Sequence, residues 1–483
     1  MKKYFNLRVL LGLIAASVVM FVARSVPHVK ESFASSRLAE FHAVEVEPTG
    51  GPNILFVCVD TLRADHVGLY GYARPTTPRI DAFFGRGRVY ERAYAASPST
   101  GPSVVSILTG LYPHRHGVRV LCQRITPDVI TIVDHLRRSG YQTAAVVSNA
   151  VLADSASGLG ERFDHYDDDV DKQEPFRDEM FERNAARTTD AAIRWMTELR
   201  HSKTRHFLWV HYIDPHGPYR PPDDKPVDFS HNKQRPIDPE RVPTYSREPD
   251  VYDGNEYIDR YDEEIAYTDR EVGRLLDAYA GLGLAEDALI IFTSDHGESM
   301  MEHEHWFRHE RNTYEEMLHV PLMLRHPSID PGPEPVEVST IDLAPTVLAM
   351  AGLAVPPQLD AVNLLPRARQ RDLLCEGRSA GRGLWRGLIQ GTRKTSARHG
   401  RSNVIREIRA FELATDPLEL SPRPVREDDP TYRFLERLIA ADPDPGGIPR
   451  QYDEGDLPSP NVAPTADPRL LRRLRQLGYV GDP

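Results

Sequence analysis

Four short segments, far apart in the chain, each join an apolar run or a Gly/Pro turn to acidic, histidine or hydroxyl side chains. They are NILFVCVDTLRAD (53–65), SPSTGPSVVSILTG (97–110), HYIDPHGPYRPP (211–222) and LIIFTSDHGE (289–298). In an open α/β sheet, ligands and catalytic groups collect at the carboxyl ends of the strands. The segments therefore predict one site on a sheet edge, and the Asp or Asp-His that ends two of them favours a metal held on rigid strands.

The periodicity of the chain predicts alternating strands and helices. Continuous apolar runs predict buried strands at 54–59, 143–147, 207–211 and 289–293. Helices are expected at 103–108, 131–139, 184–199, 261–280 and 341–351. This alternation predicts an α/β fold, with a large, mostly parallel sheet covered by helices on both faces.

The chain is long enough for a main domain and a smaller one, with 483 residues in all. We expect the main domain at 51–355 and a C-terminal subdomain with its own small sheet, plus a tail, at 356–483. The segment 218–253 lacks periodicity and is expected to be a surface insertion near the site, and 422–468 is expected to wind over the surface. The net charge of −12 argues against a nucleic-acid partner.

The N-terminus predicts export. Three basic residues precede an unbroken apolar or small stretch, VLLGLIAASVVMFVA (9–23). About 15 residues suit a signal-peptide core, whereas a membrane span needs roughly 20, so residues 1–24 are a signal peptide or a membrane anchor. Residues 25–50 read as a linker. The positive flank would leave the rest of the chain facing the periplasm on a bacterial inner membrane, or secreted.

Asp60, Asp295 and His296 follow two of the predicted strands. A lone Asp after a strand is often only a helix N-cap, but two carboxylates and an imidazole on strand ends form a ligand set for a divalent ion. Thr100 lies in a Gly/Pro turn before a predicted helix, where it is either an N-cap or a hydroxyl held at a helix N-terminus. Beside a metal, that hydroxyl becomes a candidate nucleophile.

Two further histidines complete the predicted site. His216 follows the strand at 207–211, and His309 lies thirteen residues after His296. They would contact an anionic oxygen or protonate a leaving group. His303 and His305 are near enough in sequence to take the place of His309.

In its ordered motifs the chain resembles the sulfatase family of the alkaline-phosphatase superfamily, over about residues 52–352. The resemblance rests on PNILFVCVDTLRADHVGLYGY, SILTGLYPHRHGV, FLWVHYIDPHGPY, YDEEIAYTDREVGRLLD, IIFTSDHGE, YEEMLHVPLML and TIDLAPTVLAMAGL. It implies a sulfatase-like α/β sandwich and hydrolysis or transfer of anionic esters.

The chain departs from the family pattern at one motif. Sulfatases carry C/S-x-P-S-R, in which the Cys or Ser becomes formylglycine, and here Thr100 and Val104 stand in the first and last positions. Threonine is a secondary alcohol and cannot form that aldehyde. It does resemble the nucleophile of phosphotransferases and phosphodiesterases of the same superfamily.

That likeness implies that Asp60, Thr100, Asp295 and His296 hold one divalent metal, while His216 and His309 contact the phosphoryl group or a second ion. Because Thr61 stands where a second aspartate is usual, zinc or manganese is favoured and calcium is the alternative. The implied partner is a small-molecule, glycan-linked or lipid-linked anionic ester. Two other readings stay open, namely a sulfatase that works without formylglycine and a non-catalytic module that binds anions or glycans.

Overall fold

The computed structural model describes residues 50–442, except 171–172, 175–176, 200–201, 203, 223, 310–311, 366, 380–382 and 401–403. The predicted signal or anchor (1–24), nearly all of the predicted linker (25–50) and the tail beyond 442 lie outside the described residues. Among the helices that are described, none has the length and apolar character needed to cross a membrane.

The main sheet has nine strands, and its centre is parallel. β1 (Ile54–Val59) lies between β7 (His206–Tyr212) and β8 (Leu289–Ser294), and the sheet continues from β7 through β3 (Gln142–Val147) to β4 (His165–Asp167). All of these neighbours run parallel. The four predicted strands are confirmed. Their side chains are apolar on both faces, so the strands are stable only where both faces of the sheet are covered.

The other half of the sheet was not predicted from the sequence. β11 (His319–Arg325) pairs antiparallel with both β8 and β2 (Arg88–Tyr94), and two short strands, β12 (Gly332–Glu334) and β13 (Val338–Ser339), run parallel to β2. Polar residues interrupt β2, so its pattern did not stand out as a buried run. The sheet is therefore mixed at this edge and parallel elsewhere.

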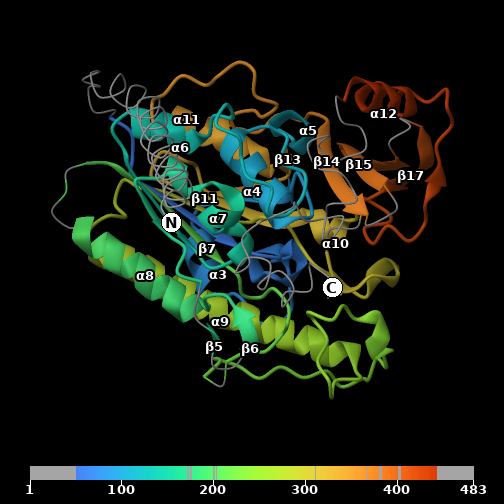
Figure 1. Cartoon of the computed structure of the whole chain (residues 1–483), viewed down its shortest axis with the longest axis horizontal. Helices are drawn as coiled ribbons and strands as arrows, with labels where there is room; N and C mark the ends of the chain where they lie inside the picture. Colours follow the sequence, from blue (N-terminus) through green and yellow to red (C-terminus); the bar gives the residue numbers. More distant parts are fainter. Residues whose placement is uncertain are drawn as a thin grey trace, which may run out of the picture. The chain divides into compact units, whose positions relative to one another are not determined.

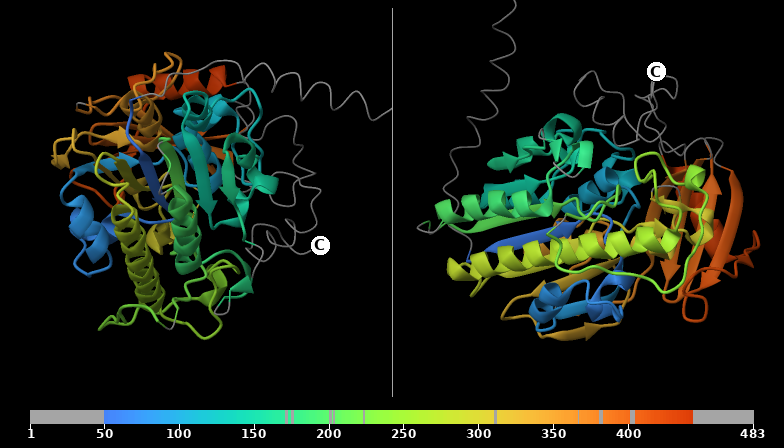
Figure 2. Two further views of the ribbon diagram at one scale, coloured as in Figure 1. Left: turned by 90° about the vertical axis from the view of Figure 1, so that its left-hand side faces the viewer. Right: turned by 90° about the horizontal axis from the view of Figure 1, so that it is seen from below.

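Helices cover both faces of the sheet, as predicted (Figure 1; Figure 2). One face carries α4 (Thr100–Thr109), α6 (Ile132–Arg138) and α11 (Leu343–Met350). The opposite face carries α3 (Pro78–Phe84), α8 (Ala185–Glu198) and α9 (Gly254–Gly281). Strand β1 shows why two cores form, since alternate side chains enter opposite hydrophobic clusters.

Shorter elements complete this region. They are α5 (Pro113–His116), α7 (Asp154–Ser157), α10 (Glu315–Leu318), and the pairs β5 (Gln173–Glu174) with β6 (Arg177–Phe181) and β9 (Ser299–Met300) with β10 (Trp306–Arg308). The insertion at 218–253 has only one helical turn, at Pro239–Arg241, among its described residues.

A second, antiparallel sheet packs beside the first. Its strands are β14 (Leu373–Ser379), β15 (Gly383–Gln390), β16 (Arg393–His399), β17 (Ile405–Glu412) and β18 (Arg423–Pro424). The prediction that 422–468 only winds over the surface was wrong, because α12 (Pro430–Ala441) lies within it. Leu435 and Ile439 of this helix are buried, and Leu435 packs on the sheet. Asp429, which caps the helix, and Pro430 at its first position were the overlooked start signals.

Candidate active site

Parallel strand pairing brings the two predicted aspartates together. Asp60 follows β1 and Asp295 follows β8, and the last residues of these strands, Val59 and Ser294, are paired in register. Both carboxylates and the adjacent His296 are completely buried. The edge of the sheet therefore carries three potential ligands on rigid supports.

Each carboxylate is oriented so that one oxygen faces the imidazole of His296. His296 Nε2 lies 3.7 Å from Oδ1 of Asp60 and 3.7 Å from Oδ2 of Asp295. The other oxygens are held by donors: Asn149 Nδ2 donates to Asp60 Oδ2 at 2.7 Å, and the His296 backbone N–H donates to Asp295 Oδ1 at 2.9 Å. Supporting bonds of this kind fix the direction of metal ligands.

The tautomer of His296 follows from its neighbours. Nδ1 lies 2.9 Å from the carbonyl oxygen of Gly297, which can only accept a hydrogen bond, so Nδ1 carries the proton. In the neutral form of the ring, the lone pair therefore lies on Nε2 and is directed into the space between the carboxylates. This is the form that binds a metal ion.

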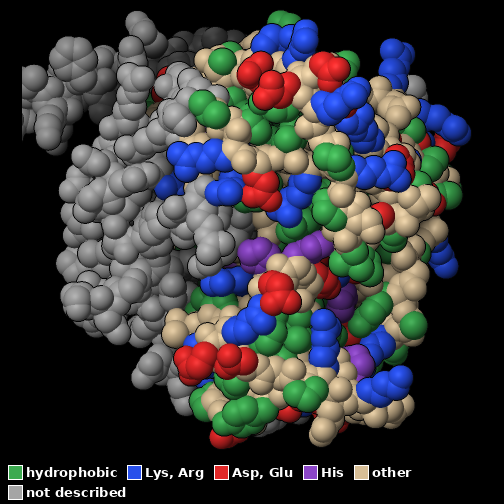
Figure 3. Space-filling model, turned by 90° about the vertical axis from the view of Figure 1, so that its right-hand side faces the viewer, with side chains coloured by type: hydrophobic (Ala, Val, Ile, Leu, Met, Phe, Trp, Pro, Cys, Tyr) green, Lys and Arg blue, Asp and Glu red, His purple; other side chains and the backbone are tan. Residues whose placement is uncertain are grey.

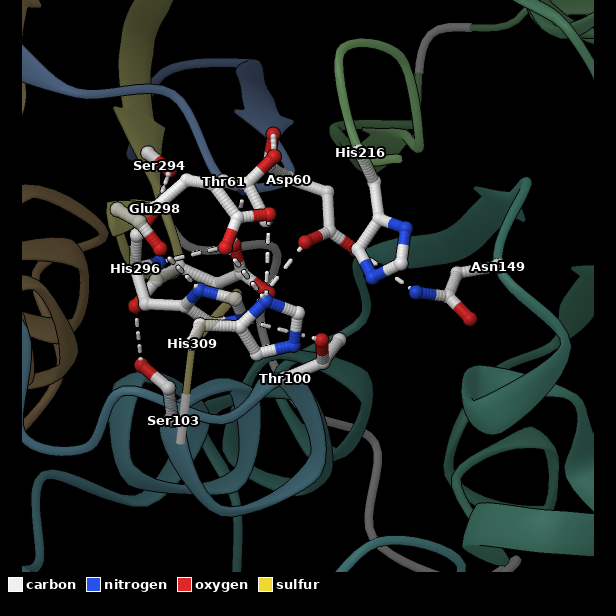
Figure 4. A network of polar contacts seen from close by, with 12 residues as sticks. Asp60, Thr61, Thr100, Ser103, Asn149, His216, Ser294, His296, Glu298 and His309 are labelled. Carbon is white, nitrogen blue, oxygen red and sulfur yellow. Dashed lines mark hydrogen bonds and ion pairs between the residues drawn. The ribbon is translucent and has the colours of Figure 1, made fainter. Parts of the chain in front are cut away.

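Thr100 enters the same space from the opposite direction (Figure 4). It is the first residue of α4, and Ser99 rather than Thr100 is the N-cap. Its Oγ1 lies 3.2 Å from His296 Nε2. Three residues after Thr100, Ser103 Oγ donates to the backbone carbonyl of Asp295 at 2.6 Å, which holds the helix against the end of β8.

His216 and His309 also reach the site, and the two imidazole centroids are 5.1 Å apart. The ring of His309 lies 4.5 Å from that of His296. His309 Nδ1 is 3.3 Å from Oε1 of Glu298, and His216 Nδ1 donates to the Gly217 carbonyl at 2.7 Å. His309 is thus the histidine that joins the cluster, and the open choice among three histidines is resolved by the fold.

The sulfatase family profile matches residues 52–353 of the chain. This chain belongs to the sulfatase family. The choline-sulfatase of Rhizobium meliloti is 29% identical over 377 residues, which cover 66% of this chain and 72% of that protein. An endo-4-O-sulfatase of Bacteroides thetaiotaomicron is 26% identical over 65% of this chain and 72% of its own length.

Solved structures show the same fold at low identity. The sulfatase yidJ from Bacteroides fragilis aligns with a TM-score of 0.65 at 21% identity, covering 84% of this chain and 99% of that one. The phosphonate monoester hydrolase of Agrobacterium radiobacter aligns with a TM-score of 0.61 at 20% identity, covering 80% and 94%. The comparisons support an ester hydrolase of the sulfatase family and confirm the predicted fold class.

Within this sulfatase-family fold, the pKa values of the two aspartates shift in opposite directions. Burial, together with the adjacent Asp295 carboxylate, raises the pKa of Asp60 well above its ordinary value. Burial also disfavours the charged form of Asp295, but His296 and His211 beside it lower the pKa of this carboxyl to about 2. Two carboxylates crowded in a dry site repel each other, and a divalent cation would remove that repulsion.

Burial keeps the two outer histidines neutral. It lowers the pKa of His216 to about 3 and that of His309 well below its ordinary value. Burial also raises the pKa of Glu298, the partner of His309, to about 7. The approach of an anionic group would oppose the shifts of the two histidines, because it favours the imidazolium forms.

Three buried polar groups of the site were not predicted. Asn149 follows β3 and orients Asp60, while Glu298 ends the fourth segment and pairs with His309. His211 lies at the end of β7, and its Nε2 is 3.7 Å from Asp295 Oδ2. The alternation of side chains along the strand could have predicted the position of His211. This residue lies on the same face of β7 as Phe207 and Trp209, and that face packs against α4.

The donor atoms fit a divalent metal. Oδ1 of Asp60 and Oδ2 of Asp295 are fully buried, and neither accepts a hydrogen bond from any residue that the structure describes. Ligand atoms of Asp60, Asp295 and His296 all lie within 4.8 Å of one another. Thr61 is not a further ligand, because its Oγ1 donates to the carbonyl of Asp60 at 2.8 Å.

Val104, which we align with the arginine of the sulfatase motif, lies on α4. Its side chain is 2% exposed and belongs to the hydrophobic cluster between α4 and the sheet. A guanidinium would have to replace apolar contacts there. The local packing of this chain is therefore built around the valine.

Proposed function

We propose that the protein is a metal-dependent hydrolase or transferase of phosphoric-type esters, with Thr100 as the nucleophile. The observation that carries this proposal is the position of Thr100 Oγ1, at the start of α4 and 3.2 Å from His296 Nε2. The hydroxyl shares a buried space with two carboxylate oxygens that have no protein partner among the described residues. A helix N-terminus favours negative charge on such an oxygen.

Asp60, Asp295 and His296, with Thr100, are the residues that would hold the ion, zinc or manganese in our proposal. When bound, the ion supplies a Lewis acid that lowers the pKa of the adjacent hydroxyl. Asn149 and the His296 N–H keep the two carboxylates turned toward that ion. Burial excludes bulk water from the same space.

The proposed reaction has two halves. In the first, Thr100 Oγ1 gives its proton to solvent and forms a bond to phosphorus, while the bond from phosphorus to the ester oxygen breaks. His216 or His309, protonated as the anionic ester enters, donates its proton to the departing alcohol. In the second half, water or an acceptor alcohol gives its proton to that same imidazole and attacks phosphorus, the bond to Thr100 breaks, and Thr100 Oγ1 takes a proton back from solvent.

A test uses three variants and a panel of aryl sulfates, phosphodiesters and phosphonate monoesters. Thr100→Ala should lower the turnover rate by about a thousandfold or more, since loss of the nucleophile removes the covalent route. Thr100→Ser should retain part of it. Thr109→Ala is the matched control, because Thr109 lies on the same helix and donates to the Val105 carbonyl. Mass spectrometry of trapped enzyme should place phosphate on Thr100.

The packing of Val104 favours a second candidate, a non-catalytic module that binds anions or glycans. This candidate gains if no compound of the panel is turned over and Thr100→Ala binds inorganic phosphate as tightly as the unaltered protein. Turnover of sulfates alone, unaffected by Thr100→Ala, would instead support a sulfatase that works without formylglycine. The panel and the one substitution therefore separate all three readings.

A further inference from the structure

A second histidine–carboxylate cluster lies where the main sheet meets the C-terminal sheet. It consists of His303, Glu316 and Glu419, which we call the junction cluster. His303 lies in the turn between β9 and β10, Glu316 in α10, and Glu419 in the loop between β17 and β18. One ligand atom from each lies within 4.8 Å of the others.

The junction cluster contains buried ligand atoms that lack a hydrogen-bond partner. His303 Nε2 and Glu316 Oε1 have none among the residues that the structure describes. Glu419 Oε1 lies 3.2 Å from the Lys394 ammonium. The side chain of Glu316 is 6% exposed and that of Glu419 is fully buried. Buried carboxylates with open lone pairs are costly unless a cation or donor compensates them.

His303 is held so that its ring faces the carboxylates. Its imidazole stacks on Tyr314 with 3.6 Å between ring centroids, and its Nε2 lies 3.9 Å from Glu316 Oε2. The residue adopts a left-handed backbone conformation with φ of 51°. Such conformations persist in non-glycine residues only where the surroundings impose them.

The nearby cations do not neutralise the cluster. Lys394 Nζ lies 3.2 Å from Glu419 Oε1 and 2.9 Å from Glu315 Oε1, so one ammonium is shared by two carboxylates. Within the described part of the chain, Glu316 forms an ion pair with His303 and with no lysine or arginine. Glu316 therefore has neither an ammonium nor a guanidinium partner among the described residues.

We propose that the junction cluster binds a divalent cation through His303, Glu316 and Glu419. An imidazole with two carboxylates favours zinc or manganese, as at the active site. Three protein ligands would leave room for water. Figure 3 shows histidine side chains at the surface among charged residues on one side of the molecule. The side chain of His303 is 10% exposed, so an ion could enter from solvent. This proposal goes beyond the proposed function and requires nothing of Thr100.

An ion here would stabilise the backbone that carries His296. The N–H of Gly297 donates to the Met317 carbonyl at 2.9 Å. A Cβ on Gly297 would lie 2.2 Å from the Glu316 carbonyl oxygen, so the two backbones are in direct contact. Binding at Glu316 would thus fix α10 against the strand end of the active site, and Glu419 would tie the C-terminal sheet to both.

The test is zinc stoichiometry in the full-length protein, measured by elemental analysis after stripping with chelator, reloading with zinc and desalting. His296→Ala removes the active-site ligand and should leave about one bound zinc per chain. Adding His303→Ala or Glu316→Gln should remove that remaining zinc. Glu407→Gln is the matched control, because Glu407 lies in the same C-terminal sheet and pairs with Arg398.

Retention of that zinc by both double variants would overturn the proposal. If His303→Ala does not fold, Glu316→Gln is the test, because it keeps the shape of the side chain. We expect zinc to raise the Tm of Glu316→Gln less than that of the unaltered protein. The two site assignments fail separately. If His296→Ala keeps every zinc of the unaltered protein while the junction variants lose one, the active-site assignment fails and the junction site stands.

Discussion

The active-site cluster and the junction cluster use the same chemical parts on different supports. Each places an imidazole Nε2 3.7–3.9 Å from carboxylate oxygens. At the active site the carboxylates follow paired strands, and donors hold their outer oxygens. At the junction the ligands come from a turn, a short helix and a loop. Strand ends give a site that is formed before the ligand arrives, whereas the junction site depends on how separate segments pack.

The largest expected difference between the clusters is in catalysis. His296→Ala should lower kcat/KM for a phosphoester by on the order of a thousandfold, since the residue lies beside the reacting hydroxyl. His303→Ala should lower it by about tenfold or less, because it acts only through the Gly297 backbone. Steady-state kinetics with zinc in excess measures both. Equal losses for the two variants would show that the clusters are one functional unit.

The next effect concerns stability at the junction. Lys394→Met should lower the free energy of unfolding of the zinc-free protein by about 3 kcal/mol, because it leaves the buried Glu419 and the partly buried Glu315 without their ammonium. Denaturant titration measures the loss. Added zinc should restore more stability to this variant than to the unaltered protein, since zinc and the Lys394 ammonium compensate the same carboxylates.

Arg393→Met is the control for that prediction. Arg393 precedes Lys394 on β16 and pairs with Asp429, but its side chain is 41% exposed. A surface pair contributes about 0–1 kcal/mol. An equal loss in both variants would mean that Lys394 acts through general packing rather than through the cluster.

A smaller effect tests the supports of the active-site cluster. Asn149→Ala removes the donor to Asp60 and should weaken zinc binding there by about 10–100-fold. Competition with a zinc-binding dye in the His303→Ala background isolates this site. Asn363→Ala is the control, because the Asn363 side chain accepts from the Leu365 N–H, in a loop after α11. Unchanged affinity in Asn149→Ala would argue against a cation between the carboxylates.

The last comparison concerns His206, a buried histidine whose partner is a tyrosine hydroxyl. It serves as a reference for the histidines of the two clusters. His206 Nε2 lies 2.9 Å from the Tyr279 hydroxyl, and burial lowers its pKa from 6.5 to about 4. The unfolded chain therefore binds the proton first, so this histidine costs stability as the pH falls from 6.5 to about 4, by on the order of 3 kcal/mol. His206→Gln should flatten that part of the pH–stability curve, and zinc should not alter the difference.

Sequence by itself determined the central part of the fold. Runs such as ILFVCV at 54–59 are apolar on both faces, and only a parallel strand between two layers of helices satisfies them. Asp60, Asp295 and His296 could be assigned to a common edge for the same reason. His216 and His309 were candidates from their places in the chain, the family resemblance gave them a role, and the structure brings both to that edge.

Only the tertiary structure decided the rest. β2 and α12 are amphipathic elements whose pattern becomes clear once their partners are known, and the choice among His303, His305 and His309 depended on a turn with unusual backbone angles. Glu316 and Glu419 are more than a hundred residues apart, and neither follows a buried strand. The position of a buried strand can be predicted from its own hydrophobic pattern. A cluster built from loops forms only when the segments that contain its residues pack together, and no local pattern predicts that packing.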